Sequence, residues 1–173
     1  MHRFLQLLAI LVVAATIGGS APVAADSATD VSRHIRTTDR RLARLLHHGR
    51  RESARFRTLL ARLVRSDVIV YLQCQGYVNA GGRLTFVGAG GDYRYVLVRL
   101  GRLLNERQQI ALIAHELQHA VEIADTPEIV DARSLADQYR RFGHVSRTSL
   151  TSTDYDTIAA IEAGYQVLRE LAE

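Results

Sequence analysis

The sequence predicts an α+β protein in which N-terminal helices are followed by a small antiparallel β-sheet and then by C-terminal helices. Three observations support this. Residues 26–66 carry apolar side chains at helical spacing, residues 67–100 are rich in β-branched, aromatic and glycine residues, and residues 105–171 return to helical spacing. The length of 173 residues fits one compact domain after an N-terminal leader.

Residues 1–25 have the layout of a secretory signal peptide. Met1-His2-Arg3 gives a positive start, an apolar run follows, and small residues lead up to Ala25. An uncleaved membrane anchor is the alternative, but the apolar run is short for a bilayer span, which needs about 20 residues. We therefore expect export to the periplasm or the extracellular space, cleavage after Ala25, no membrane contact after cleavage, and a single domain over residues 26–173.

Residues 26–66 form an arginine-rich lead-in, for which we expect two amphipathic helices separated at Gly49-Arg50-Arg51. Eleven arginines fall between Arg33 and Arg65, in a chain of formal net charge +4. Such a run could bind nucleic acid or an anionic membrane. Acidic residues interrupt it and no nucleic-acid motif accompanies it. We therefore interpret the arginines as solvated helix faces and expect no nucleic-acid partner.

Three segments in the middle of the chain are expected to be strands, namely residues 67–72, 84–87 and 93–100. Glycine-rich connections between them indicate short turns, and this favours antiparallel pairing. The run Gly88-Ala89-Gly90-Gly91 lacks the Gly-Lys-Ser/Thr ending of a phosphate-binding loop. We interpret it as a hairpin connection.

The next segment is expected to be a long amphipathic helix. Asn105 can cap its start, with Gln108 three residues later in the capping-box position, and Pro127 favours an end nearby. An apolar stripe follows the cap: Ile110, Ile113, Ala114, Leu117, Val121 and Ala124. The remaining elements are expected, in order, to be a helix over about 131–141, a Ser/Thr-rich loop over 144–154 and a last helix from about Asp156.

This long helix carries the residues with the clearest chemistry. His115 and His119 are four positions apart and so lie on one face of a helix, one turn apart. Two neutral imidazoles at this spacing can share one zinc ion. Glu116 lies beside the first histidine, where its carboxylate can take the proton of a water that zinc acidifies. The pattern His-Glu-x-x-His predicts metal-dependent hydrolysis.

On these residues the chain resembles the zincin metallopeptidases, and among them the small gluzincin-like members. The resemblance covers roughly residues 67–170, with a small sheet, a motif helix and a downstream helix. It implies a peptide or protein substrate and one zinc ion as cofactor. It also implies that the strand ahead of the motif helix, Tyr93 to Leu100, is the edge strand that lines the cleft and pairs with an extended substrate.

The resemblance further implies a third zinc ligand outside the motif, because catalytic zinc takes three protein ligands and a water. In gluzincins this ligand is a glutamate on a later helix, and Glu162 is the glutamate inside the last predicted helix before its very end. Glu122, three residues after His119, is an alternative ligand, although a hydrogen bond to that histidine suits it better. Asp125 stands at the metzincin ligand position, but Glu122 replaces the glycine that those enzymes need.

Three further residues near the proposed third ligand could stabilise an oxyanion: Tyr155, His144 and Tyr165. Cys74 is the single cysteine, so no internal disulfide is expected, and we interpret it as a small buried strand residue rather than a metal ligand. Two functions of other classes stay open. One is a non-enzymatic exported domain with a structural zinc enclosed by four ligands. The other is an arginine-rich surface binding module.

Overall fold

The structure, a computed structural model, describes residues 31–75, 81–142, 144–146 and 154–173 and has the α+β architecture that the sequence predicts. The expected signal peptide lies outside the described residues. The elements are β1 (Ile35–Arg36), α2 (Arg40–Glu52), α3 (Ala54–Val64), β2 (Val68–Cys74), β3 (Gly82–Gly90), β4 (Tyr93–Leu100), α4 (Glu106–Ala124), α5 (Ala132–Phe142), β5 (His144–Ser146), β6 (Asp154–Asp156) and α6 (Ile158–Glu170).

The main sheet is mixed, so the prediction of an antiparallel sheet was wrong. Its strand order is β1-β2-β4-β3, with β1, β2 and β4 parallel and β3 antiparallel to β4. The edge-strand assignment of Tyr93–Leu100 was also wrong, because this strand lies between β2 and β3. The glycine-rich signals specify only the β3–β4 hairpin, which turns at Gly91 with a φ of 58°. They carry no information on which of the two strands pairs with β2.

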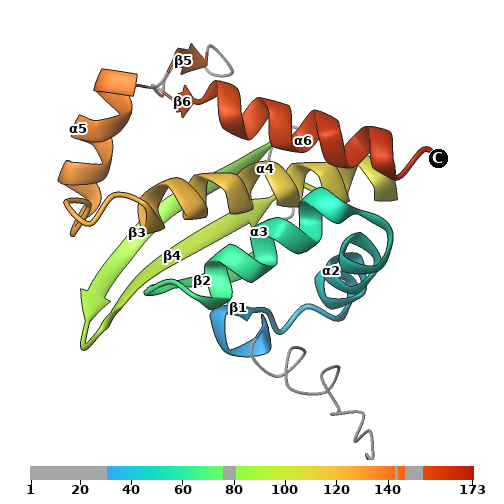
Figure 1. Cartoon of the computed structure of the whole chain (residues 1–173), viewed down its shortest axis with the longest axis horizontal. Helices are drawn as coiled ribbons and strands as arrows, with labels where there is room; N and C mark the ends of the chain where they lie inside the picture. The colour runs from blue at the N-terminus through green and yellow to red at the C-terminus, as the bar shows by residue number, and fades with distance from the viewer. Residues whose placement is uncertain (1–30, 76–80, 143, 147–153) are drawn as a thin grey trace, which may run out of the picture.

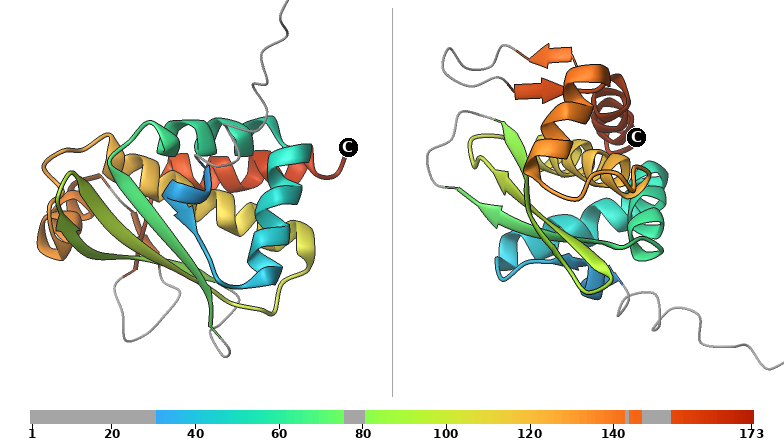
Figure 2. Two further views of the ribbon diagram at one scale, coloured as in Figure 1. Left: turned by 90° about the horizontal axis from the view of Figure 1, so that it is seen from below. Right: turned by 90° about the vertical axis from the view of Figure 1, so that its left-hand side faces the viewer.

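The sheet buries one face against the helices, as Figure 2 shows. Inward side chains alternate along the two central strands, in keeping with the period of a half-buried strand. They are Val68, Val70 and Leu72 from β2 and Val96, Val98 and Leu100 from β4. Ile110, Ile113 and Leu117 of α4 are fully buried in the same core. Each such side chain contributes about 1.5–3 kcal/mol through burial, so α4 is held firmly against the sheet.

Helix α4 runs between α3 and α6, which flank it on the side away from the sheet (Figure 1). It begins with the capping box predicted at Asn105 and Gln108, which satisfies two backbone N–H groups of the first turn. Helix α6 approaches it closely through small residues. A Cβ added at Gly164 would lie 3.3 Å from the carbonyl oxygen of Ala111 and 3.5 Å from Cβ of His115. Glycine at this position therefore brings α6 directly against the motif.

A buried arginine fixes the other end of α4. Arg94 on β4 is 6% exposed, and its guanidinium donates to both carboxylate oxygens of Asp67 at 2.7 Å. It also donates to four carbonyl oxygens at and beyond the helix C-terminus: those of Ile123, Ala124, Thr126 and Ile129. They lie where the regular i+4 hydrogen bonds of the helix run out and beside the negative end of its dipole. Arg94 thus ties the end of α4 to the sheet.

The two N-terminal helices are present, but they separate at Ser53 and not at Gly49-Arg50-Arg51. Ser53 caps α3 by accepting a hydrogen bond from the backbone N–H of Phe56 at 3.0 Å. Gly49 is buried inside α2, where an added Cβ would lie 2.8 Å from Cγ2 of Ile110. Its role is close packing against α4, and this is why it does not break the helix.

The region after α4 agrees with the prediction of a helix over 131–141 and differs in the segment that follows. The expected loop over 144–154 contains the short antiparallel strands β5 and β6 at its two ends. Helix α6 begins at Ile158 with Thr157 as its N-cap, so Asp156 precedes the helix as the last residue of β6. Within the described residues, no helix combines the length and the apolar character that a membrane span requires.

Candidate metal centre

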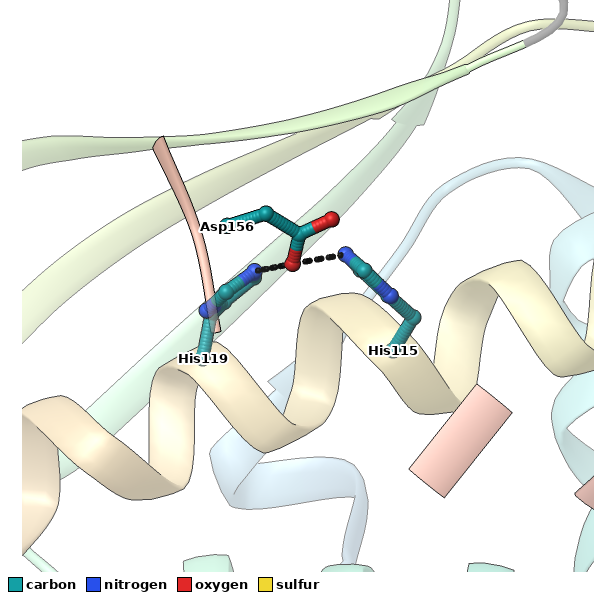
Figure 3. A group of neighbouring side chains, drawn as sticks. All are labelled: His115, His119 and Asp156. Atoms are coloured by element: carbon teal, nitrogen blue, oxygen red, sulfur yellow. Dashed lines mark ion pairs between the residues drawn. The ribbon is translucent and has the colours of Figure 1, made fainter. Parts of the chain in front are cut away.

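The two histidines of the motif project from α4 on the same side, one turn apart, as predicted (Figure 3). Their ring centroids are 4.9 Å apart and the rings are almost perpendicular, at 81°. Their Nε2 atoms both face one oxygen of Asp156. Oδ1 of that carboxylate lies 3.3 Å from Nε2 of His115 and 3.5 Å from Nε2 of His119.

The three side chains His115, His119 and Asp156 form a donor set that fits a zinc ion. Their ligand atoms all lie within 4.8 Å of one another. Zinc–ligand bonds of about 2.0–2.1 Å in a tetrahedral site put neighbouring ligand atoms roughly 3.4 Å apart. The two nitrogen–oxygen separations match that value without rearrangement. Two imidazoles and one carboxylate are also a usual ligand set of catalytic zinc.

The ring nitrogens that face away from this cluster have partners of their own. Nδ1 of His119 lies 2.9 Å from Oε2 of Glu122 and 2.9 Å from the hydroxyl oxygen of Tyr139. The His115 ring hydrogen-bonds the backbone of Ala160 on α6. Because a carboxylate oxygen can only accept, Nδ1 of His119 carries the proton of its hydrogen bond to Glu122. Nε2 of the same ring faces a second carboxylate, that of Asp156, and would present a lone pair once a cation displaced its proton. This is the arrangement that orients histidine toward a metal.

The charges of these groups are strongly coupled. Burial favours the neutral form of His119, but hydrogen bonds to Asp156 and Glu122 outweigh it and raise the pKa of the ring to about 9. Burial and the neighbouring His119 lower the pKa of His115. Burial works against the charged form of Glu122, yet the hydrogen bonds it accepts from His119, Thr157 and Tyr139 lower its pKa. A cation at the Nε2 atoms would replace the proton on His119.

Glu116 lies on α4 between the two histidines and is 3% exposed. Its carboxylate lies against the first residue of β3, because a Cβ added at Gly82 would come within 2.3 Å of Oε1. Its charge also acts on both His119 and Tyr139. The absence of a side chain at Gly82 therefore gives the Glu116 carboxylate room beside the edge strand.

The structure does not bring Glu162 to the histidines. It is exposed on α6, whereas Ala160, Ala163 and Gly164 form the buried face of that helix. Since successive helical residues point about 100° apart, the face that packs on α4 excludes position 162. The carboxylate that lies beside both histidines is that of Asp156, for which the sequence predicted only the start of a helix.

The other candidate ligands also have different partners. Glu122 bonds the outer nitrogen of His119 and so lies on the far side of that ring from Asp156. Asp125 forms an ion pair with Arg62 at 2.5 Å. Cys74 hydrogen-bonds Asp39 at the end of β2, and burial raises the pKa of its thiol.

Of the three residues proposed to stabilise an oxyanion, the structure describes the side chain of one. Tyr165 is 62% exposed on α6, away from the buried face of that helix. His144 pairs with Asp156, and Val145 with Tyr155, in the β5–β6 ladder, while the side chains of His144 and Tyr155 lie outside the described part. Tyr139 was missed. Its phenol contacts His119, and burial together with the charge of Glu122 raises its pKa.

Comparisons of this chain with protein-family models, with curated proteins and with solved structures gave no match. Membership of the zincins therefore stays a prediction from the motif. The chemistry of the site can still be argued from its own groups, which are two imidazoles, a convergent carboxylate and a second, buried carboxylate on the same helix.

Proposed function

We propose that this chain is an exported zinc-dependent metallopeptidase that hydrolyses peptide bonds. The observation that carries the proposal is the convergence of Nε2 of His115, Nε2 of His119 and Oδ1 of Asp156, with ligand atoms within 4.8 Å of one another. These three residues would hold the zinc. Three protein ligands leave a fourth position for water or substrate, as in catalytic sites.

Each residue has a defined task in this proposal. When bound, zinc would supply Lewis acidity that polarises a substrate carbonyl and activates water. The Glu116 carboxylate would take a proton from the attacking water and later give it to the leaving nitrogen. Its burial beside Gly82 keeps bulk water away from that carboxylate and holds it at one place on the helix.

A peptide substrate is supported by the position of β3. This strand is the edge of the sheet nearest to Glu116, and on its outer side no further strand pairs with it among the described residues. An extended peptide could add to this edge through backbone hydrogen bonds. The substrate-binding strand that the zincin resemblance implies is thus better assigned to Gly82–Gly90 than to Tyr93–Leu100.

A structural zinc site is less favoured by the same geometry. A closed site has four protein ligands, whereas the cluster found in the described part of the chain has three. Cys74 and Asp125, which could have closed such a site, have partners elsewhere. The arginine-rich module has no comparable site geometry in its support.

The proposal is tested by metal content and by hydrolysis of a peptide library. Protein secreted with its own leader should begin at Asp26 and hold about one zinc per chain. A His115→Ala/His119→Ala double variant should lose the zinc, while His47→Ala, at an exposed position on α2, should keep it. Glu116→Gln should keep the metal and lose hydrolysis, because the amide cannot accept the proton. Unchanged turnover in Glu116→Gln would remove Glu116 from the mechanism.

A further inference from the structure

Glu122 is the acceptor at the centre of a small network next to the candidate metal centre. Its Oε2 lies 2.9 Å from Nδ1 of His119 and accepts from the Tyr139 hydroxyl at 3.3 Å. Its Oε1 accepts from Oγ1 of Thr157 at 2.6 Å. These three partners come from α4, α5 and the start of α6, so one carboxylate joins three elements.

Thr157 connects this network to the third ligand position. Its backbone N–H donates to Oδ1 of Asp156 at 2.8 Å, and its hydroxyl oxygen accepts from the N–H of Ala160 as the cap of α6. The same hydroxyl donates its proton to Glu122. Two hydrogen bonds through Thr157 therefore link the Glu122 carboxylate to the oxygen of Asp156 that faces both histidines.

Tyr139 closes the network on the outer side of His119. Its ring meets the His119 ring edge-on, with centroids 5.4 Å apart, and its hydroxyl reaches both His119 and Glu122. His119 is 5% exposed, so its ring has little room to turn once these contacts are made. The ring is thus fixed from behind while its Nε2 faces Asp156.

We infer that Glu122 is a positioning residue that sets the two halves of the metal centre relative to each other. Through His119 it fixes the tautomer and the plane of a ligand on α4. Through Thr157 it fixes the place of Asp156 at the start of α6. The inference rests on the proposed metal site and assigns Glu122 no bond to the metal, because its oxygens bond the outer nitrogen of His119 and the Thr157 hydroxyl.

Zinc affinity of the folded protein, measured by competition with a chromophoric chelator, tests the inference. Glu122→Ala and Thr157→Val should each weaken zinc binding by about 10- to 100-fold, as loss of groups behind metal ligands does. The Glu122→Ala/Thr157→Val double variant should bind zinc no more weakly than the weaker-binding of the two single variants, because both changes break the same hydrogen bond between Thr157 and Glu122. Thr157→Ser keeps the hydroxyl and should bind within about threefold of the wild type.

Thr157 also caps α6, so the cap needs its own control. Asn105→Ala removes the cap of α4, far from the network, and should lower the Tm by a comparable amount without changing zinc affinity. A Thr157→Val variant that loses Tm but keeps wild-type zinc affinity would overturn the positioning role. So would losses of affinity that add independently in the double variant. If wild-type protein binds no zinc, the proposed function fails first and the positioning role fails with it.

Discussion

The two halves of the candidate metal centre are built in different ways. On α4, His115, Glu116 and His119 are fixed by helix periodicity within one buried helix. At the β6–α6 junction, Asp156 and Thr157 reach the same place only through packing of α6 on α4. Glu122 and Thr157, which bond across the two halves, are 35 residues apart in the chain.

The supports of the two halves differ as well. Helix α4 is capped at its start by Asn105 and tied at its end by Arg94. The junction depends on the close approach at Gly164 and on the hydrogen bonds of Thr157. We therefore expect changes to the support of α4 to act on the stability of the whole domain, and changes at the junction to act on the metal.

Arg94→Met should have the largest effect of the variants that compare the two halves. It removes the charged hydrogen bonds to Asp67 and those to the buried carbonyl oxygens of Ile123 and Ile129 beside the end of α4. We expect a loss of about 3–5 kcal/mol in the free energy of unfolding, measured by urea denaturation of the metal-free protein. Arg107→Met, at an exposed position on α4, is the matched control and should change it by less than about 0.5 kcal/mol.

The same pair predicts an acid dependence. The hydrogen bond from Arg94 lowers the pKa of Asp67 despite partial burial. A carboxyl group whose pKa is lower in the folded state stabilises that state at pH values above its unfolded pKa of about 3.9. This contribution is lost as the pH falls from there through the folded-state pKa. The stability gap between wild type and Arg94→Met should therefore narrow below about pH 4. If the difference in unfolding free energy stays constant down to about pH 2.5, the ion pair with Asp67 does not contribute to the stabilisation by Arg94.

Asp156→Asn should come next, with its effect on the metal and not on the fold. Replacing the carboxylate removes the charge that faces both Nε2 atoms. Zinc affinity should fall by at least about 100-fold, since losing a group that only hydrogen-bonds a metal ligand already weakens binding by up to about that factor. Glu162→Gln, on the exposed face of α6, should leave the affinity within about threefold of the wild type. Chelator competition on both variants compares the two carboxylates directly, and the opposite ranking would restore Glu162 as third ligand.

Gly164→Val should have a smaller effect and tests how the junction reaches α4. The new side chain would press on the carbonyl of Ala111 and on Cβ of His115, which moves α6 outward. Overpacking of this kind costs about 1–3 kcal/mol, and we expect weaker zinc binding in addition. Ala159→Val, at an exposed position on the same helix, is the control. Wild-type affinity in a folded Gly164→Val variant would argue against the close approach as the feature that positions Asp156.

The half of the candidate metal centre on α4 could be predicted from the sequence, whereas the half at the β6–α6 junction could not. Local signals were sufficient for α4, its capping box and the placing of both histidines on one face. The sheet order could not be predicted, since no local pattern specifies that β4 pairs with β2. Asp156 was missed because nothing in its neighbourhood links it to the histidines. The small residues Ala160, Ala163 and Gly164, however, already indicate a closely packed face that turns Glu162 away.

The burial of α4 has a consequence for the energetics of metal capture. Ile113 and Leu117, on either side of the first histidine, are completely buried, and both ends of the helix are tied. The conformational entropy of His115 and His119 is therefore largely lost during folding, at about 1–2 kcal/mol for each backbone position. A preorganised pair of imidazoles leaves more of the coordination energy available as affinity. A chelator should accordingly remove the metal from a domain that stays folded.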